Sequence, residues 1–132
     1  MIYLDSCALV KLVSPEAESQ ALEDFLSRYT GSRQVSSALV RTELRRALLQ
    51  KNAQQHRFEL ADQILARLRL VDVVTRVLDA AGAVPSRSLR SLDAIHVVTA
   101  QLLQPSLEMF VTYDKRLASV AQDHGFRVVA PA

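Results

Sequence analysis

The sequence has few of the residues on which several kinds of site depend. Its 132 residues include a single cysteine, Cys7, no tryptophan and only seven aromatic side chains. One cysteine excludes a disulfide framework and a cysteine-based zinc site within one chain. So few aromatic rings disfavour a platform on which nucleic-acid bases stack.

Long hydrophobic runs are also missing. No stretch approaches the roughly 18 consecutive apolar residues of a membrane span, so we expect no membrane attachment. Asp5 interrupts the apolar run at the start, and no basic segment precedes it, unlike a signal peptide. With the single cysteine, these features predict a cytoplasmic protein. The composition, 49% apolar and 23% charged, is typical of a globular chain, and the length predicts one domain over residues 1–132.

The net charge is only +2, but the charged residues are unevenly distributed. Residues 1–40 carry three basic and five acidic side chains, residues 41–76 carry eight and four, and residues 77–132 carry five of each. A basic middle segment is typical of a surface that binds an anionic partner such as RNA. It is also typical of a solvated helix face, and the charges alone leave both interpretations open.

Short apolar runs alternate with amphipathic segments, a pattern that predicts an α/β fold. Because the runs are apolar throughout, we expect a largely parallel sheet covered on both faces, with ligands beyond the carboxyl ends of its strands. The expected strands are residues 1–4, 34–37, 70–74, 108–112 and 126–130. The expected helices are residues 7–13, 15–30, 39–48, 54–69, 76–81, 91–103 and 114–124.

Several helix starts have recognisable signals. Ser6 and Ser91 are predicted to cap the helices that follow them, because a serine hydroxyl can accept from a free backbone N–H. Pro15 is predicted to open the second helix, with Glu16 and Glu18 in its first turn, where carboxylates favour the positive helix end.

Four carboxylates occupy positions from which they can meet. Asp5 ends the first predicted strand, and Asp114 follows the fourth, so both emerge at the same edge of a parallel sheet. Asp93 lies in the first turn of its helix, and Glu43 lies mid-helix at the border of an apolar stripe. A 132-residue domain has a radius of gyration of roughly 14 Å, so residues this far apart in sequence can converge.

Such a cluster needs a cation. Two carboxylates about 5 Å apart repel by roughly 3 kcal/mol at an effective dielectric of 20. Mg²⁺ or Mn²⁺ suits an all-oxygen site and activates water for attack on a phosphodiester. The simpler interpretation is that Asp5, Asp93 and Asp114 cap helices and that Glu43 pairs with Arg46 one turn on.

The whole chain resembles the PIN-domain nucleases, most closely the VapC toxins of bacterial toxin–antitoxin pairs. The order and spacing of four motifs carry the resemblance. They are Ile2 to Ser6, Ser36 to Val40 with Glu43-Leu44, Leu92 to His96 with Thr99-Ala100, and Val111 to Leu117. The resemblance implies a three-layer α/β/α fold with a five-stranded parallel sheet.

The family's acidic pattern maps onto the four carboxylates chosen above. The resemblance implies that Asp5 and Asp93 bind the metal ion, Mg²⁺ or Mn²⁺, and that Asp114 binds it either directly or through a water molecule. It implies that Glu43 orients or deprotonates the attacking water. The small polar positions of the pattern are Ser6 and Thr112, which would support the site.

Other residues have less specific interpretations. Cys7 is read as a small buried side chain. His96, on the same helix side as Asp93, is read as a packing residue or a support behind the site, because oxygen atoms would ligate the metal. Some arginines are candidates for contact with RNA phosphates and are equally compatible with solvation: Arg41, Arg45, Arg87, Arg90 and Arg116.

The leading hypothesis is a metal-dependent endoribonuclease, the toxin of a toxin–antitoxin pair. The resemblance implies products with a 5′-phosphate and a 3′-hydroxyl, homodimerisation, and inhibition by a cognate VapB-type antitoxin. The alternative is a catalytically quiet PIN-like module that sequesters an antitoxin or RNA. A phosphotransfer domain with Asp5 as acceptor is disfavoured, because position 7 is a cysteine where that pattern has a second aspartate.

Overall fold

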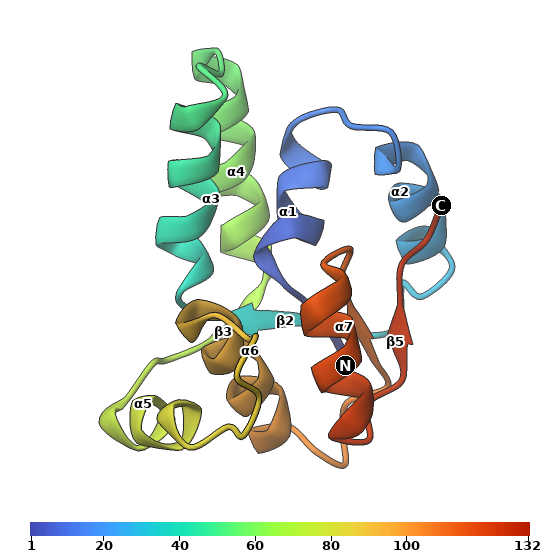
Figure 1. The fold of residues 1–132 in the computed structure, drawn as a ribbon. Helices are drawn as coiled ribbons and strands as arrows, with labels where there is room; N and C mark the ends of the chain where they lie inside the picture. Colours follow the sequence, from blue (N-terminus) through green and yellow to red (C-terminus); the bar gives the residue numbers. More distant parts are fainter.

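The apolar runs form strands and the amphipathic segments form helices in the computed structural model, which describes residues 1–132 (Figure 1). The longest helix has 13 residues, and none is long and apolar enough to cross a membrane. In chain order the elements are β1 (Ile2–Leu4), α1 (Ser6–Val13), α2 (Ser19–Ser27), β2 (Gln34–Ser37), α3 (Val40–Gln50), α4 (Gln55–Arg67), β3 (Arg69–Val71), α5 (Thr75–Gly82), α6 (Ser91–Leu102), β4 (Met109–Val111), α7 (Lys115–Asp123) and β5 (Val128–Val129).

The five strands form one sheet in the order β3-β2-β1-β4-β5, and every neighbouring pair is parallel. β1 lies at the centre, where Tyr3 pairs with Val35 of β2 on one side and Phe110 of β4 on the other. The chain builds outward from β1 in one direction through β3 and then crosses to β4. The carboxyl ends of β1 and β4 therefore form the switch point at which open α/β sheets bind ligands.

Side chains of β1 alternate between the two faces of the sheet, as the period of a strand requires. Ile2 and Leu4 belong to an apolar cluster with helices α1 to α4, whereas Tyr3 belongs to a second cluster with α6 and α7. Figure 1 shows α1, α3 and α4 above the sheet and α5 and α6 below it. The predicted three-layer α/β/α fold with a five-stranded parallel sheet is confirmed.

Two predicted serine caps are wrong. Asp5, not Ser6, is the N-cap of α1: its backbone is extended and its Oδ1 accepts from the Ala8 N–H at 2.9 Å. Ser91 is already the first residue of α6, whose cap position, Arg90, makes no side-chain capping bond. A cap residue needs a non-helical backbone and an oxygen that reaches the free N–H groups, and a serine inside the first turn does not meet the first condition.

The second helix begins at Ser19, four residues later than Pro15 predicts. Glu16 and Glu18 instead accept from Lys11 Nζ at 3.0 and 2.8 Å, in the loop between α1 and α2. Lys11 is only 8% exposed, and a charge so far out of water needs partners of opposite sign. The ammonium of Lys11 therefore draws these carboxylates into a loop that helix propensity alone would not predict.

Candidate active site

The four predicted carboxylates come from four separate elements and line one cavity of about 270 Å³. Asp5 precedes α1, Asp93 lies in the first turn of α6, and Asp114 is the N-cap of α7. Glu43 lies in the first turn of α3, not in its middle, because that helix begins at Val40. Cavity residues from the same elements are Ser6, Cys7, Arg90, Ser91 and Leu92.

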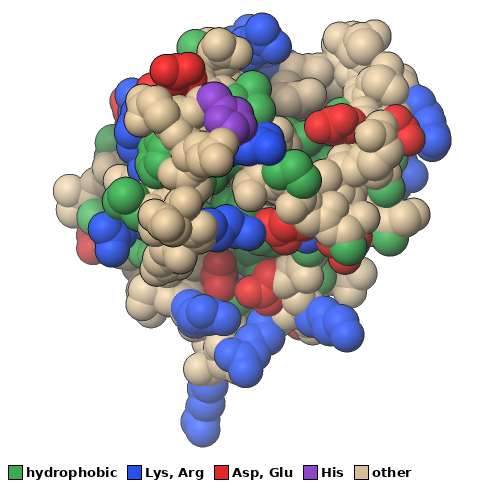
Figure 2. Space-filling model, turned by 90° about the horizontal axis from the view of Figure 1, so that it is seen from above, with side chains coloured by type: hydrophobic (Ala, Val, Ile, Leu, Met, Phe, Trp, Pro, Cys, Tyr) green, Lys and Arg blue, Asp and Glu red, His purple; other side chains and the backbone are tan.

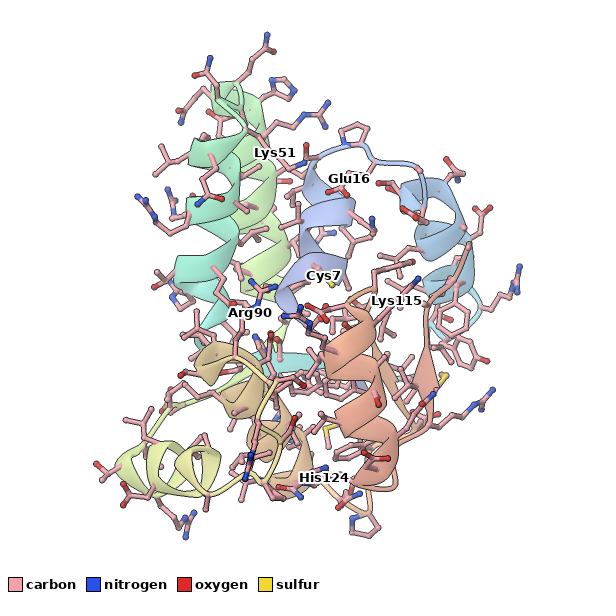
Figure 3. The ribbon with its side chains drawn as sticks, viewed as in Figure 1. Cys7, Glu16, Lys51, Arg90, Lys115 and His124 are labelled. Carbon is pink, nitrogen blue, oxygen red and sulfur yellow. The ribbon has the colours of Figure 1, made fainter.

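The sheet topology explains why these residues meet. Asp5 directly follows β1 and Thr112 directly follows β4, and these neighbouring strands end at the switch point. The first turns of α3 and α6 also reach this edge and carry Glu43 and Asp93. The positive N-terminal end of a helix favours negatively charged side chains such as these. Figure 3 shows Cys7 on α1 and Arg90 before α6 on either side of this region, with Lys115 at the start of α7.

Asp5 is a buried acceptor rather than a free carboxylate. Its oxygens accept from the Ala8 N–H at 2.9 Å, from Cys7 Sγ at 3.0 and 3.1 Å, and from the Thr112 hydroxyl. Only 2% of Asp5 is exposed, and burial raises its pKa although these hydrogen bonds oppose the shift. The same burial, with the neighbouring Asp5 charge, raises the pKa of the Cys7 thiol to about 12, so Cys7 donates as a neutral group.

Thr112 joins two of the acidic residues. Its hydroxyl donates to Asp5 and accepts from the Asp114 backbone N–H at 3.1 Å. The Asp114 Oδ1 in turn accepts from the N–H groups of Arg116 and Leu117 at 2.8 and 3.1 Å. Asp114 is therefore both a helix cap and a cavity residue, so the two interpretations of its position in the sequence are compatible.

Glu43 is held at both of its oxygens. Ser6 Oγ donates to Oε2 at 3.2 Å, and His96 Nε2 lies 2.7 Å from Oε1. The contact between Ser6 and Glu43 gives Ser6 a place in the site. The pairing of Glu43 with Arg46, weighed from the sequence, is replaced by the pairing with His96. Sequence reasoning missed Tyr3, whose hydroxyl lies 2.6 Å from His96 Nδ1, because a buried strand residue offers no signal of polar chemistry.

Asp93 is the half-buried carboxylate of the cavity. Burial, followed by the negative charge of Asp114, raises the pKa of Asp93 above its ordinary value. His96 and, to a smaller extent, Arg90 act in the opposite direction and do not cancel the effect. Negative charges thus accumulate here without a sufficient counter-charge from the chain itself.

The donor chemistry of the cavity fits a hard divalent cation. Four carboxylates and one guanidinium line it, which gives a formal charge of −3 when all are ionised. Carboxylate oxygens are the ligands that Mg²⁺ and Mn²⁺ prefer. As placed, no three His, Cys, Asp or Glu side chains are close enough to share one metal ion, so binding would draw the carboxylates inward.

The candidate RNA-binding arginines lie in three places. Arg90 lines the acidic cavity, and Arg116 lines a neighbouring groove of about 530 Å³ between α7 and the loop that precedes α6. Arg87 is exposed on that loop. Figure 2 shows Asp and Glu side chains near the middle of one face of the molecule, with Lys and Arg side chains around them. Arg41 and Arg45 lie elsewhere, in a groove beside α4, where Arg45 pairs with Asp62 at 2.7 Å.

Comparisons with known proteins agree with this architecture. Residues 2–123 match the PIN-domain family. Ribonuclease VapC46 of Mycobacterium tuberculosis is 46% identical over 131 residues, 99% of this chain and 98% of that protein. The crystal structure of Mycobacterium tuberculosis VapC20, a sarcin-ricin loop cleaving toxin, superimposes with a TM-score of 0.78 at 16% identity, over 99% of this chain and 100% of that one. A toxin–antitoxin complex from Klebsiella pneumoniae gives a TM-score of 0.73 at 19% identity, over 100% of this chain and 98% of that one. The similarity along almost the full chain leads to one conclusion: the chain belongs to the VapC family of PIN-domain proteins.

Proposed function

We propose that the protein is a divalent-metal-dependent endoribonuclease and the toxin of a toxin–antitoxin pair. The observation that carries this proposal is the cavity itself, which gathers Asp5, Glu43, Asp93 and Asp114 from distant parts of the chain at the sheet's switch point. A pocket with a formal charge of −3 repels an RNA phosphate unless a cation reverses its sign. Membership of a family whose relatives are named ribonucleases supports the same activity.

Asp5, Asp93 and Asp114 would hold Mg²⁺ or Mn²⁺. Such an ion lowers the pKa of bound water and neutralises charge on the phosphodiester. Thr112 fixes the direction of the Asp5 carboxylate and of the Asp114 backbone, so two of the three ligands are oriented by one hydroxyl. Outer hydrogen bonds of this kind orient the ligands of a metal site.

Glu43, which lines the cavity, would orient the attacking water and accept its proton. Ser6 and His96 contact its two oxygens, so the carboxylate has a fixed direction. In the reaction, the water oxygen bonds to phosphorus and the bond from phosphorus to the 3′-oxygen breaks. The 3′-oxygen takes up a proton, which gives a 5′-phosphate and a 3′-hydroxyl.

The groove between α7 and the loop before α6 is the proposed path of the RNA backbone. Lys115 and Arg116 line it, together with Ser86 and Ser88 from the loop. Lys115 of the groove directly follows Asp114 of the acidic cavity, so the groove adjoins the proposed reaction centre. Figure 3 shows Lys115 at the end of α7 nearest Cys7 and His124 at the opposite end. Backbone charge, rather than base stacking, would hold the RNA.

Removal of metal provides the test of the proposed activity. The wild-type protein, incubated with short labelled RNA oligonucleotides of random sequence, is expected to cleave them with Mn²⁺ or Mg²⁺ and to stop when EDTA is added. Analysis of the ends should show 5′-phosphates and 3′-hydroxyls. Cleavage that continues in EDTA contradicts the metal mechanism. Absence of both cleavage and Mn²⁺ binding in calorimetry would favour the alternative, a quiet module that sequesters an antitoxin or RNA.

The proposed RNA path makes a separate prediction. Replacing Lys115 and Arg116 by glutamine should weaken RNA binding and reduce the slope of log Kd against log salt by roughly 0.7 for each lost phosphate contact. Fluorescence anisotropy of the labelled oligonucleotides at several salt concentrations measures this slope. Replacing Arg28 and Arg127 by glutamine, at two exposed arginines outside the groove, is the matched control. An unchanged slope in the double variant would exclude the groove as the RNA path.

We also propose a cognate VapB-type antitoxin as the protein partner, a homodimer as the oligomeric state and the cytoplasm as the place of action. Membership of the VapC family supports these proposals. The negative cavity suits a partner that inserts a basic segment near it. A small neighbouring gene whose product copurifies with this chain and inhibits RNA cleavage would support the pairing.

A further inference from the structure

A chain of three polar side chains runs from the centre of the sheet to the acidic cavity. The Tyr3 hydroxyl lies 2.6 Å from His96 Nδ1, and His96 Nε2 lies 2.7 Å from Glu43 Oε1. Tyr3 and His96 are fully buried, whereas the Glu43 side chain is 15% exposed. This hydrogen-bond chain therefore starts among apolar side chains and ends on a carboxylate that lines the cavity.

The direction of each hydrogen bond follows from donor and acceptor chemistry. An ionised Glu43 can only accept, so the hydrogen must be on His96 Nε2. In a neutral imidazole, Nδ1 is then an acceptor, and the Tyr3 hydroxyl donates to it. The three groups thus satisfy one another with a single arrangement of hydrogens.

Tyr3, the first member of this hydrogen-bond chain, is held rigidly. Tyr3 is in the central strand, where β2 and β4 pair with its backbone on both sides. Its ring stacks on Phe110 at a centroid distance of 4.9 Å and meets the His96 ring edge-on at 5.8 Å. Interior packing at crystal-like density leaves such rings little freedom. The position of His96 Nε2 is therefore set by the centre of the sheet.

Glu43 has no comparable anchor on its own element. It lies in the first turn of α3, and its other side-chain contact is with Ser6 of α1. Without His96, the carboxylate could rotate toward solvent at the mouth of the cavity.

We propose that Tyr3 and His96 are positioning residues, which fix the rotamer of Glu43 and thereby aim its carboxylate at the attacking water. This inference rests on the proposed ribonuclease function for the role of Glu43, whereas the hydrogen-bond chain itself does not. Tyr3 acts through His96 and His96 acts through Glu43, so neither needs to touch RNA or metal.

The tautomer of His96 tests the hydrogen-bond chain without any catalytic assay. Long-range ¹H–¹⁵N correlation spectra of the ¹⁵N-labelled wild-type protein should show His96 with its hydrogen on Nε2 and a bare Nδ1. The His96→Gln variant assigns the signal among the three histidines of the chain. In Tyr3→Phe, the Nδ1 resonance should shift, because its donor is lost. A wild-type His96 with its hydrogen on Nδ1 and a bare Nε2 would overturn the proposal.

A matched pair of substitutions tests the effect on cleavage. His96→Leu removes the donor to Glu43, and kcat for the labelled RNA oligonucleotides with Mn²⁺ should fall roughly 10- to 100-fold while KM changes little. His96→Gln places an amide N–H near the Nε2 position and should recover most of that loss. Tyr3→Phe, which keeps the ring, should give a smaller loss. His56→Leu, at an exposed histidine of α4, is the control.

The outcomes separate positioning from folding and from the proposed function. Equal activity of the Gln and Leu variants, at equal melting temperatures, would show that the Nε2 donor does not matter and would overturn the proposal. If His96→Leu does not fold, the Gln variant and Tyr3→Phe still give the comparison. If the wild type cleaves no RNA with either metal, the proposed function fails. The spectra of the His96 tautomer then decide by themselves whether the hydrogen-bond chain from Tyr3 to Glu43 exists.

Discussion

Replacing Asp5 by asparagine is expected to lower the rate of RNA cleavage by roughly 100-fold or more, since even the outer partners of a metal site are worth 10- to 100-fold. The substitution removes the charge that would attract the metal ion. It also places an amide NH₂ where a carboxylate oxygen accepts hydrogen bonds. The donors around Asp5 are the Ala8 N–H, the Cys7 thiol and the Thr112 hydroxyl. The amide therefore meets a donor that it cannot satisfy.

Cleavage of the labelled oligonucleotides with Mn²⁺, compared at equal protein concentration, measures this effect. The melting temperature of Asp5→Asn should be recorded, because an unsatisfied donor in a buried site also costs stability. Asp79→Asn, at an exposed aspartate of α5, is the control for loss of one negative charge. Equal cleavage by the wild type and Asp5→Asn would refute both the proposed metal site and the role of Asp5 as one of its ligands.

The Asp93→Asn substitution is expected to have two effects of opposite sign: cleavage falls by a factor comparable to that of Asp5→Asn, and stability without metal rises. Burial and the charge of Asp114 raise the pKa of Asp93 in the folded chain. Its contribution to stability is therefore full below the ordinary aspartate pKa and is lost as pH rises through the raised value. At neutral pH the ionised carboxylate opposes folding, and asparagine removes that charge.

The expected increase in melting temperature is on the order of 2–4 °C at neutral pH in EDTA, and it should vanish in acid, where wild-type Asp93 is protonated. Thermal unfolding at a series of pH values measures it. Mn²⁺ should raise the melting temperature of the wild type more than that of Asp93→Asn, because the ion binds the folded carboxylates. A lower melting temperature for Asp93→Asn in EDTA, with Asp79→Asn unchanged, would contradict the repulsion described here.

The sequence predicted the strands and helices well where one local signal dominates. The apolar run before Asp5 and the apolar run before Thr112 each form a strand, and Asp114 caps the following helix as expected. Parallel neighbours end at one edge, so these strand ends already placed two carboxylates together. The prediction of the acidic cavity therefore followed from topology, before any side-chain position was known.

Local signals failed where a distant partner competes with them. Pro15 predicted a helix start, but the buried ammonium of Lys11 holds Glu16 and Glu18 in a loop. The charge of their segment did not reveal that Arg41 and Arg45 line a groove beside α4, apart from the acidic cavity, and their contact with RNA stays a prediction. Sequence spacing says on which element a side chain lies and does not say which neighbour it contacts.

The sequence by itself determined the layered α/β architecture, the four acidic positions and the family, because periodicity, strand ends and motif order are local or linear properties. Only the tertiary structure decided that Asp5 caps its helix, that Thr112 links Asp5 to Asp114, and that Tyr3 reaches Glu43 through His96. These contacts join residues up to 107 positions apart. Their geometry depends on how buried polar groups find partners across the packed layers, which is a property of the whole fold.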